Sequence, residues 1–215
     1  MSILIATPCY GGMVTEGYLR SCLALRKELL AVGIEHDWLT IANESLVQRA
    51  RNVIAASFLR ETEFSALLFI DADIEFEPAG VARLWNLVAD GADVAVGAYR
   101  MKRPGAGLAA WRGGKLVEIG EKDVLPFEVD YAGTGFMMIS RKTLEIIIEK
   151  QPQIEHEEGQ IGKCWAFFDC GVVDDGAGPF YVSEDYHFSR TVRKLGMKIM
   201  LDPQISLKHH GQAVY

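Results

Sequence analysis

The chain has 215 residues, of which 49% are hydrophobic and 24% charged, values ordinary for a soluble globular domain with one sizeable core. Its 22 basic and 29 acidic residues give a formal net charge of -7, which argues against a general nucleic-acid binder, because such proteins need a basic surface. No apolar run approaches the roughly 18 residues that a membrane span needs, so we expect none. The four cysteines lack zinc-type spacing and no signal-peptide core begins the chain, which indicates reduced thiols and a cytoplasmic location.

Strands and helices alternate over about the first 100 residues. Apolar runs predict strands over residues 2–7, 36–42, 66–70 and 94–96. Amphipathic spacing predicts helices over residues 15–33, 45–60 and 78–91. Ser45 and Gln48 fit a capping box at the start of the second helix. This alternation is typical of parallel βαβ units in a nucleotide-binding α/β half.

The chain beyond residue 100 has a different pattern. We expect a hairpin around residues 112–115, a strand over 129–139, a helix over 141–150, an irregular glycine-rich segment over 151–180, a helix over 183–195 and a strand over 197–201. No repeat and no linker separates the two parts. The sequence therefore predicts one domain over residues 1–215, built from a half over 1–100 and a half over 101–215.

Asp71 and Asp73 follow directly on the apolar strand over residues 66–70. In open α/β sheets ligands collect at the carboxyl ends of strands, and carboxylates two residues apart can point the same way. Such oxygen ligands suit Mg²⁺ or Mn²⁺, which hold a diphosphate by shared coordination. The alternative is a strand-to-helix turn that is acidic without binding anything.

Three further groups carry polar chemistry, each with a plainer alternative. Glu184 and Asp185 open a helix, where acids either complement the helix dipole or supply a general base. One of His209 and His210, near the end of the chain, either completes a metal shell or lies in an exposed tail. Arg49 and Asn52, three residues apart on the second helix, form either a solvated edge or a contact to a base or phosphate.

In chain order these groups resemble the GT-A-fold glycosyltransferases, particularly small bacterial and viral members related to family-two enzymes and to the fungal Anp-type mannosyltransferases. The resemblance rests on residues 5–10, 45–52, 69–74, 133–137, 183–185 and 207–211 and so covers nearly the whole chain. It implies an α/β GT-A fold, with a Rossmann-like nucleotide-binding half, a mixed central sheet and a smaller acceptor-binding and catalytic half.

The resemblance also implies a role for each matching residue. Those implied to bind the nucleotide sugar are Thr7, Pro8, Tyr10, Arg49, Asn52, Asp71, Ala72 and Asp73. Those implied to hold Mn²⁺ or Mg²⁺ are Asp73, His209 and Asp71, with Asp73 as the principal ligand. Gly133, Thr134 and Gly135 would border the acceptor, and Asp185, beside Glu184, would be the catalytic base. Trp165, in an aromatic and glycine-rich segment, is either an acceptor platform or a cover for the sheet.

These roles describe a metal-dependent, hexosyltransferase-like enzyme that moves a sugar from a nucleotide-diphosphate sugar to a hydroxyl of a glycan or another acceptor. Asp185 as base implies inversion, whereas the Anp-type relatives retain. A non-catalytic nucleotide-sugar-binding module is the alternative of a different class. A sugar nucleotidyltransferase would need a basic loop after the first strand, and a haloacid-dehalogenase-type phosphatase would not continue with Ile74 and Glu75.

Overall fold

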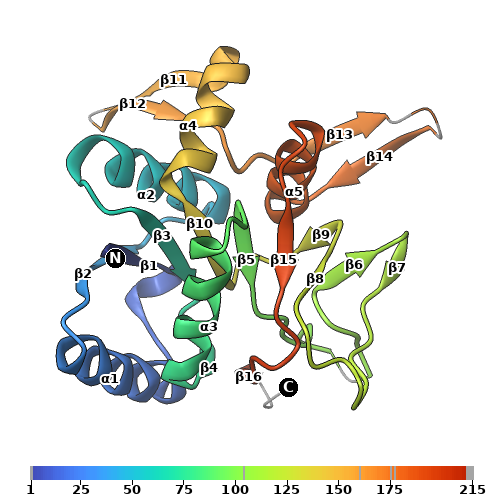
Figure 1. Ribbon diagram of the computed structural model, residues 1–215. Helices are drawn as coiled ribbons and strands as arrows, with labels where there is room; N and C mark the ends of the chain where they lie inside the picture. The colour runs from blue at the N-terminus through green and yellow to red at the C-terminus, as the bar shows by residue number, and fades with distance from the viewer. Residues whose placement is uncertain (1, 104, 160, 175, 177, 212–215) are drawn as a thin grey trace.

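A seven-stranded mixed sheet runs through the middle of the molecule (Figure 1). The computed structural model describes residues 2–103, 105–159, 161–174, 176 and 178–211. The strands, in order across the sheet, are β2 (Glu35–Ala42), β1 (Ser2–Cys9), β3 (Ala66–Ile70), β10 (Phe136–Ser140), β5 (Val94–Val96), β15 (Ile199–Leu201) and β8 (Phe127–Glu128). The pairs β1–β2, β1–β3 and β5–β15 are parallel, whereas β10 runs antiparallel to β3 and β5. Both predicted halves therefore contribute strands to one sheet, and the predicted mixed α/β architecture is confirmed.

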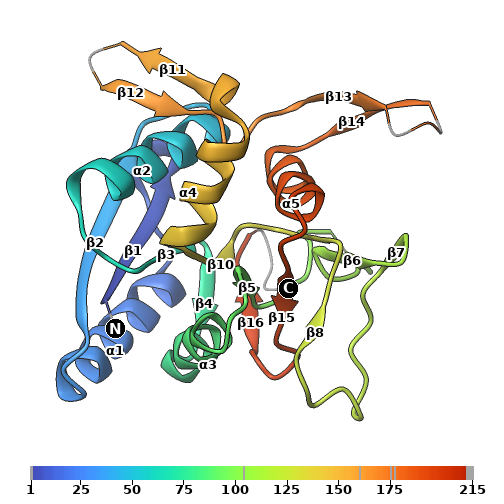
Figure 2. The same ribbon diagram turned by 45° about the horizontal axis from the view of Figure 1, so that its top comes forward.

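Helices cover both faces of this sheet (Figures 1 and 2). They are α1 (Glu16–Ala31) and α3 (Pro78–Ala89) on one face, and α2 (Val47–Glu61), α4 (Arg141–Lys150) and α5 (Glu184–Lys194) on the other. Successive side chains of β3 point to opposite faces of the sheet. Leu68 packs with side chains of α1 and α3, and Phe69 packs with side chains of α2, α4 and α5. Burial on both faces explains why β3 is an unbroken apolar run.

The helix starts agree with the sequence except at α2. Thr15, where the first helix was predicted to begin, is the N-cap residue of α1, and its Oγ1 accepts a hydrogen bond from the amide of Tyr18. The predicted capping box of Ser45 and Gln48 is wrong, because Leu46 is the N-cap residue and no side chain caps this end. The carboxylate of Glu44 instead accepts a hydrogen bond from the backbone amide of Leu46, at 3.1 Å. Ser45 is left to line a cavity.

The second half departs more from the prediction. The strand expected over residues 129–139 is broken into β9 (Tyr131–Ala132), which joins β6 (Ala110–Arg112) and β7 (Lys115–Leu116), and β10, which joins the central sheet. The segment expected to be irregular contains the 3₁₀ turn η2 (Pro152–Ile154) and two hairpins, β11 (Glu155–Glu158) with β12 (Gly162–Trp165), and β13 (Gly171–Asp174) with β14 (Pro179–Val182). Both hairpins lie at the outer margin of the molecule (Figures 1 and 2). The predicted turn between β6 and β7 is confirmed, with Gly113 and Gly114 at φ 57° and 76°.

The end of the described chain returns to the aspartate segment. Strand β16 (Leu207–His209) pairs antiparallel with β4 (Ile74–Phe76), so that His209 stands opposite Ile74. His209 is thus held in a strand and does not belong to an exposed tail. All four cysteines are free thiols. Among the described residues, no helix combines the length and the apolar character that crossing a membrane requires.

Candidate functional site

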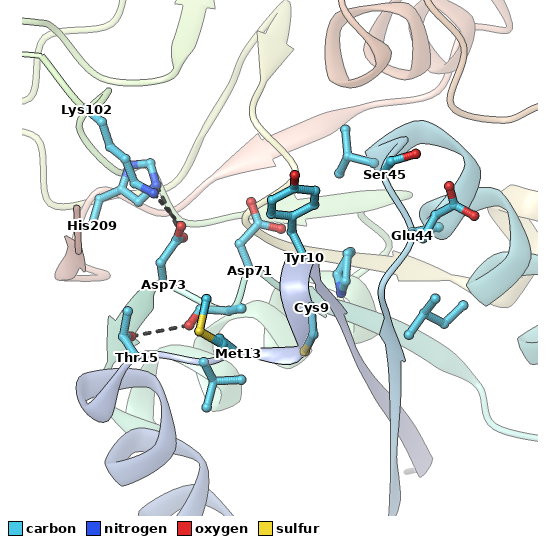
Figure 3. A pocket seen from close by; sticks show the side chains of 16 residues that line it. Cys9, Tyr10, Met13, Thr15, Glu44, Ser45, Asp71, Asp73, Lys102 and His209 are labelled. Atoms are coloured by element: carbon cyan, nitrogen blue, oxygen red, sulfur yellow. Dashed lines mark hydrogen bonds and ion pairs between the residues drawn. The ribbon is translucent and has the colours of Figure 1, made fainter. Parts of the chain in front are cut away.

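A cavity of about 670 Å³ opens at the carboxyl ends of β1 and β3 (Figure 3). It is lined by Pro8, Cys9 and Tyr10, which lead from β1 into the short 3₁₀ turn η1 (Tyr10–Gly12), by Glu44 and Ser45 ahead of α2, by Asp71, Ala72 and Asp73 after β3, and by Lys102 and His209. Five of the predicted nucleotide-sugar residues therefore meet at one cavity, together with the predicted histidine. The site lies where open α/β sheets bind their ligands.

Backbone hydrogen bonds from three distant segments hold the aspartate turn in place. Asp71 N donates to Gly135 O at 2.9 Å, Thr15 N donates to Ala72 O at 2.8 Å, and His210 N donates to Asp73 O at 2.8 Å. Because the residues that flank α1, β10 and β16 each make one of these bonds, the direction of the two carboxylates is set by tertiary structure. The turn is preorganised before any ligand enters.

Asp71 points toward a buried arginine. Arg51 Nη2 lies 3.0 Å from Asp71 Oδ1, and Arg51 Nε lies 3.7 Å from Glu184 Oε1. The side chain of Arg51 is only 4% exposed, and its guanidinium stands 5.5 Å from the centre of the Phe69 ring. Nε and Nη1 of Arg51 are buried without a hydrogen-bond partner in the described structure. Arg51, Asp71, Glu184 and Asp185 are called the inner set below.

Glu184 and Asp185 form the first turn of α5. Asp185 Oδ1 accepts hydrogen bonds from Ser183 Oγ and, at 2.8 Å, from Tyr186 N. Burial raises the pKa of Asp185 above its ordinary value, and burial together with the charge of Asp185 raises the pKa of Glu184. A carboxylate with a raised pKa is a stronger proton acceptor. Neither residue lines the cavity, and Arg51 connects Glu184 to Asp71.

Asp73 points toward the opposite side, where Lys102 and His209 meet it (Figure 3). Asp73 Oδ2 accepts a hydrogen bond from Lys102 Nζ. Asp73 Oδ1 lies 3.4 Å from His209 Nε2 and is buried without a hydrogen-bond partner in the described structure. Burial raises the pKa of Asp73, but His209 and Lys102 lower it more, so that the pKa lies below its ordinary value. Asp73, Lys102 and His209 are called the outer set below.

The second nitrogen of His209 fixes the ring. Nδ1 lies 2.8 Å from the carbonyl oxygen of Arg100 and donates to it, since a carbonyl oxygen can only accept, which leaves Nε2 as the ring nitrogen that faces Asp73. Asp73 Oδ1, which has no hydrogen-bond partner in the described structure, and the imidazole nitrogen facing it are atoms of the kinds that bind divalent cations. Asp73 and His209 supply only two ligands, and the described residues hold no group of three or more that could bind a metal.

Glycines bring Tyr99 close to the aspartate turn. The Tyr99 hydroxyl accepts from Gly135 N at 3.1 Å, and a Cβ at Gly133 would lie 2.3 Å from that oxygen. A Cβ at Gly135 would lie 2.9 Å from Asp71 Oδ2. The predicted acceptor residues Gly133 and Gly135 thus pack against Tyr99, and Gly135 also packs against Asp71. Only glycine leaves room for these side chains. Thr134 is buried, and its hydroxyl has no partner in the described structure.

Besides the residues around Gly133 and those at the start of α5, four further predicted site residues lie outside the cavity lining. Thr7 is buried, with its hydroxyl 2.6 Å from that of Tyr18, and Asn52 pairs through both amide atoms with the backbone of Phe168 at 2.8 and 2.9 Å. Arg49 is bound by Glu44 and Glu158 at 2.7 and 2.8 Å. Trp165 is 7% exposed and belongs to the core, which is the arrangement expected of a cover for the sheet.

Two basic residues of the site were missed from the sequence. Arg51 could have been found by helix spacing, because Ile54, Ala55 and Phe58 stand three, four and seven positions later and are all buried with it. Lys102 lies in no recognisable pattern, and only the folded chain brings it to Asp73.

Comparisons with known proteins reveal the fold. A crystal structure of A197 from STIV is similar, with a TM-score of 0.61, 19% sequence identity, and coverage of 98% of this chain and 86% of that chain. Neither the protein-family models nor the curated proteins give a match. At this identity the likeness concerns architecture alone: the chain has a Rossmann-like α/β fold with a mixed seven-stranded sheet.

Proposed function

We propose that the protein is a metal-dependent glycosyltransferase of the GT-A fold, which takes its donor from a nucleotide-diphosphate sugar. The observation that carries this proposal is the outer set, in which Asp73 and His209 face each other at a cavity beyond the carboxyl ends of parallel strands. A nucleotide at this edge of the sheet agrees with the general rule for such folds. The cavity also has a size usual for small-molecule sites.

Asp73 and His209 would hold the divalent cation, Mn²⁺ or Mg²⁺, and both metals usually complete such a shell with water and substrate phosphate oxygens. When bound, the cation supplies positive charge to the diphosphate leaving group. Asp71 is engaged by Arg51, which favours a contact to the donor over metal binding for this residue. Pro8, Tyr10 and Ala72 line the same cavity and would contact the nucleotide sugar.

The chain's own residues then account for the transfer. Asp185 accepts the proton of the acceptor hydroxyl while that oxygen forms a bond to the anomeric carbon. The bond from the anomeric carbon to the diphosphate oxygen breaks, and its electron pair leaves with the diphosphate. Burial raises the pKa of Asp185, which strengthens it as a base, and Arg51 links Glu184, its neighbour in the chain, to Asp71. Direct displacement of this kind inverts the anomeric configuration.

The test combines binding with turnover. Purified protein is mixed with UDP-, GDP-, CDP- and ADP-linked sugars in the presence of Mn²⁺, Mg²⁺ or a chelator, and thermal stability and donor consumption are measured. We expect one nucleotide series to raise the melting temperature only with metal, and the donor to be consumed. Protection that ignored the metal would count against the role of Asp73. NMR of the glycoside would show an inverted anomeric centre, and retention would remove Asp185 from its role as base.

A non-catalytic nucleotide-sugar-binding module is the second candidate, and one observation favours it: Glu184 and Asp185 do not line the cavity. Such a module would bind the donor with metal and consume none of it. Replacing Asp185 would then leave the affinity for the donor and the metal unchanged. Donor consumption that depends on Asp185 decides for the enzyme.

A further inference from the structure

Lys102 is the only lysine or arginine among the described residues that line the cavity, where it stands with the carboxylates of Glu44, Asp71 and Asp73. A diphosphate would bring further negative charge into this acidic space. The positive charge that receives it must come from a bound cation, from Lys102 or from both. Lys102 is therefore the side chain of the cavity lining that is best suited to pair with a diphosphate, in addition to its ion pair with Asp73.

The ion pair places Lys102 where it opposes cation binding. Lys102 Nζ donates a hydrogen bond to Oδ2 of Asp73, and Oδ1 of the same carboxylate faces His209. The carbonyl oxygen that holds the His209 ring belongs to Arg100, two residues before Lys102, so one loop supports both partners of Asp73. A divalent cation between Asp73 and His209 would lie beside the ammonium group, and like charges at such short range repel.

The side chain of Lys102 can leave Asp73 without disturbing the loop that carries it. A bridge between Arg100 and Leu108 closes this loop, and Met101 N donates to Gly107 O at 3.2 Å. These bonds involve only the backbone, and the Lys102 side chain is 36% exposed. Rotation about its own bonds suffices to carry the ammonium group from Asp73 into the cavity. Arg51, enclosed at the other aspartate, has no such freedom.

We propose that Lys102 is a mobile counter-ion: it neutralises Asp73 when no metal is bound, is displaced from that carboxylate by the divalent cation, and then pairs with the diphosphate of the donor. This inference rests on the proposed function. It makes Lys102 a donor-binding residue whose contact is to phosphate and therefore independent of the base. It also makes metal and nucleotide bind cooperatively, because the diphosphate gives the displaced ammonium a new partner.

The test compares the wild type with Lys102→Met, which removes the charge and keeps the length of the side chain. Mn²⁺ binding to nucleotide-free protein is measured by electron paramagnetic resonance. UDP, GDP and CDP binding at saturating Mn²⁺ is measured by calorimetry. We expect Lys102→Met to bind Mn²⁺ alone about threefold more tightly, because a competing ion pair is gone. We expect it to bind each nucleoside diphosphate that the wild type binds about tenfold more weakly, because a charge-assisted hydrogen bond is lost.

Lys208→Met is the matched control, since Lys208 also pairs with a carboxylate, that of Glu75 at 2.8 Å, and does not line the cavity. It should change neither affinity, and Lys102→Arg should keep the nucleotide affinity. Urea unfolding confirms that each variant is folded. Unchanged Mn²⁺ and nucleotide affinities in Lys102→Met would overturn this inference while leaving the proposed function intact. A wild-type protein that bound neither Mn²⁺ nor any nucleoside diphosphate would overturn both.

Discussion

Asp71 and Asp73 lie on one turn and face the same cavity, yet their surroundings differ in kind. In the inner set, Asp71 meets an arginine that is 4% exposed and also reaches Glu184. In the outer set, Asp73 meets a lysine that is 36% exposed and a histidine at 3.4 Å. A buried guanidinium is enclosed by its neighbours, whereas an exposed ammonium on a flexible stem can exchange one anion for another. The comparison separates a fixed electrostatic support from a site that can take up a ligand.

The largest expected effect belongs to the inner set and tests catalysis. Asp185→Asn removes the proton acceptor while keeping the shape of the side chain, so turnover should fall about 10²- to 10⁴-fold. Nucleoside diphosphate affinity should change little, because Asp185 does not line the cavity. Steady-state kinetics and calorimetry measure the two quantities. Glu184→Gln should lose much less turnover, and a larger loss there would exchange the roles of the two acids.

The next effect tests whether the two cations differ in stability. Arg51→Met leaves Asp71 and Glu184 without their buried partner and should lower the free energy of unfolding by about 2–4 kcal/mol. Lys102→Met removes the same charge from a more exposed pair and should cost less than about 1 kcal/mol. Urea unfolding of both variants gives the comparison. Equal losses would show that the inner and outer sets do not differ in the way their burial indicates.

A third prediction uses two carboxylate–histidine pairs that lie along the paired strands β4 and β16. Asp73 faces His209 at the cavity, and Glu75 lies 2.8 Å from His210 on the side of α1. Asp73→Asn should weaken Mn²⁺ binding by about 100-fold, since a charged ligand contact is worth ~3 kcal/mol. Glu75→Gln, with the same chemistry outside the cavity, should leave the Mn²⁺ affinity unchanged. Equal loss in both variants would place the metal elsewhere.

Much of the fold was predictable because local sequence and tertiary structure agree. The apolar run over Ala66–Ile70 is a strand buried on both faces, and Thr15 caps its helix. Prediction failed where short strands pair with a near neighbour in the chain, as in β11 with β12 and β13 with β14. Strands of four residues carry too little apolar periodicity to be recognised. Their pairing depends on partners that only the folded chain provides.

The candidate site divides in the same way. Asp71 and Asp73 were found because their spacing and their place after a strand are visible in the chain, and His209 was found through the family resemblance. The fold brings all three to one cavity. Arg51 and Lys102 were missed because their importance lies in what they touch, and their partners are 20 and 29 residues away. Acidic residues that follow a strand can be recognised from the local sequence. The basic side chains that pair with them can be identified only from tertiary contacts.

The smallest expected effect concerns the pKa of Asp185. Burial raises this pKa, and the hydrogen bond from Ser183 lowers it, so Ser183→Ala should raise it further. Asp185 must be ionised to accept a proton, which means that activity is lost as the pH falls through its pKa. The acidic limb of the kcat–pH profile should therefore move to higher pH, by about half a unit to one unit. Ser189→Ala is the control, because Ser189 Oγ donates to the backbone carbonyl of Asp185 at 2.9 Å and leaves the carboxylate untouched. An acidic limb that stays in place in Ser183→Ala, or moves equally in Ser189→Ala, would mean that another group limits the rate at low pH.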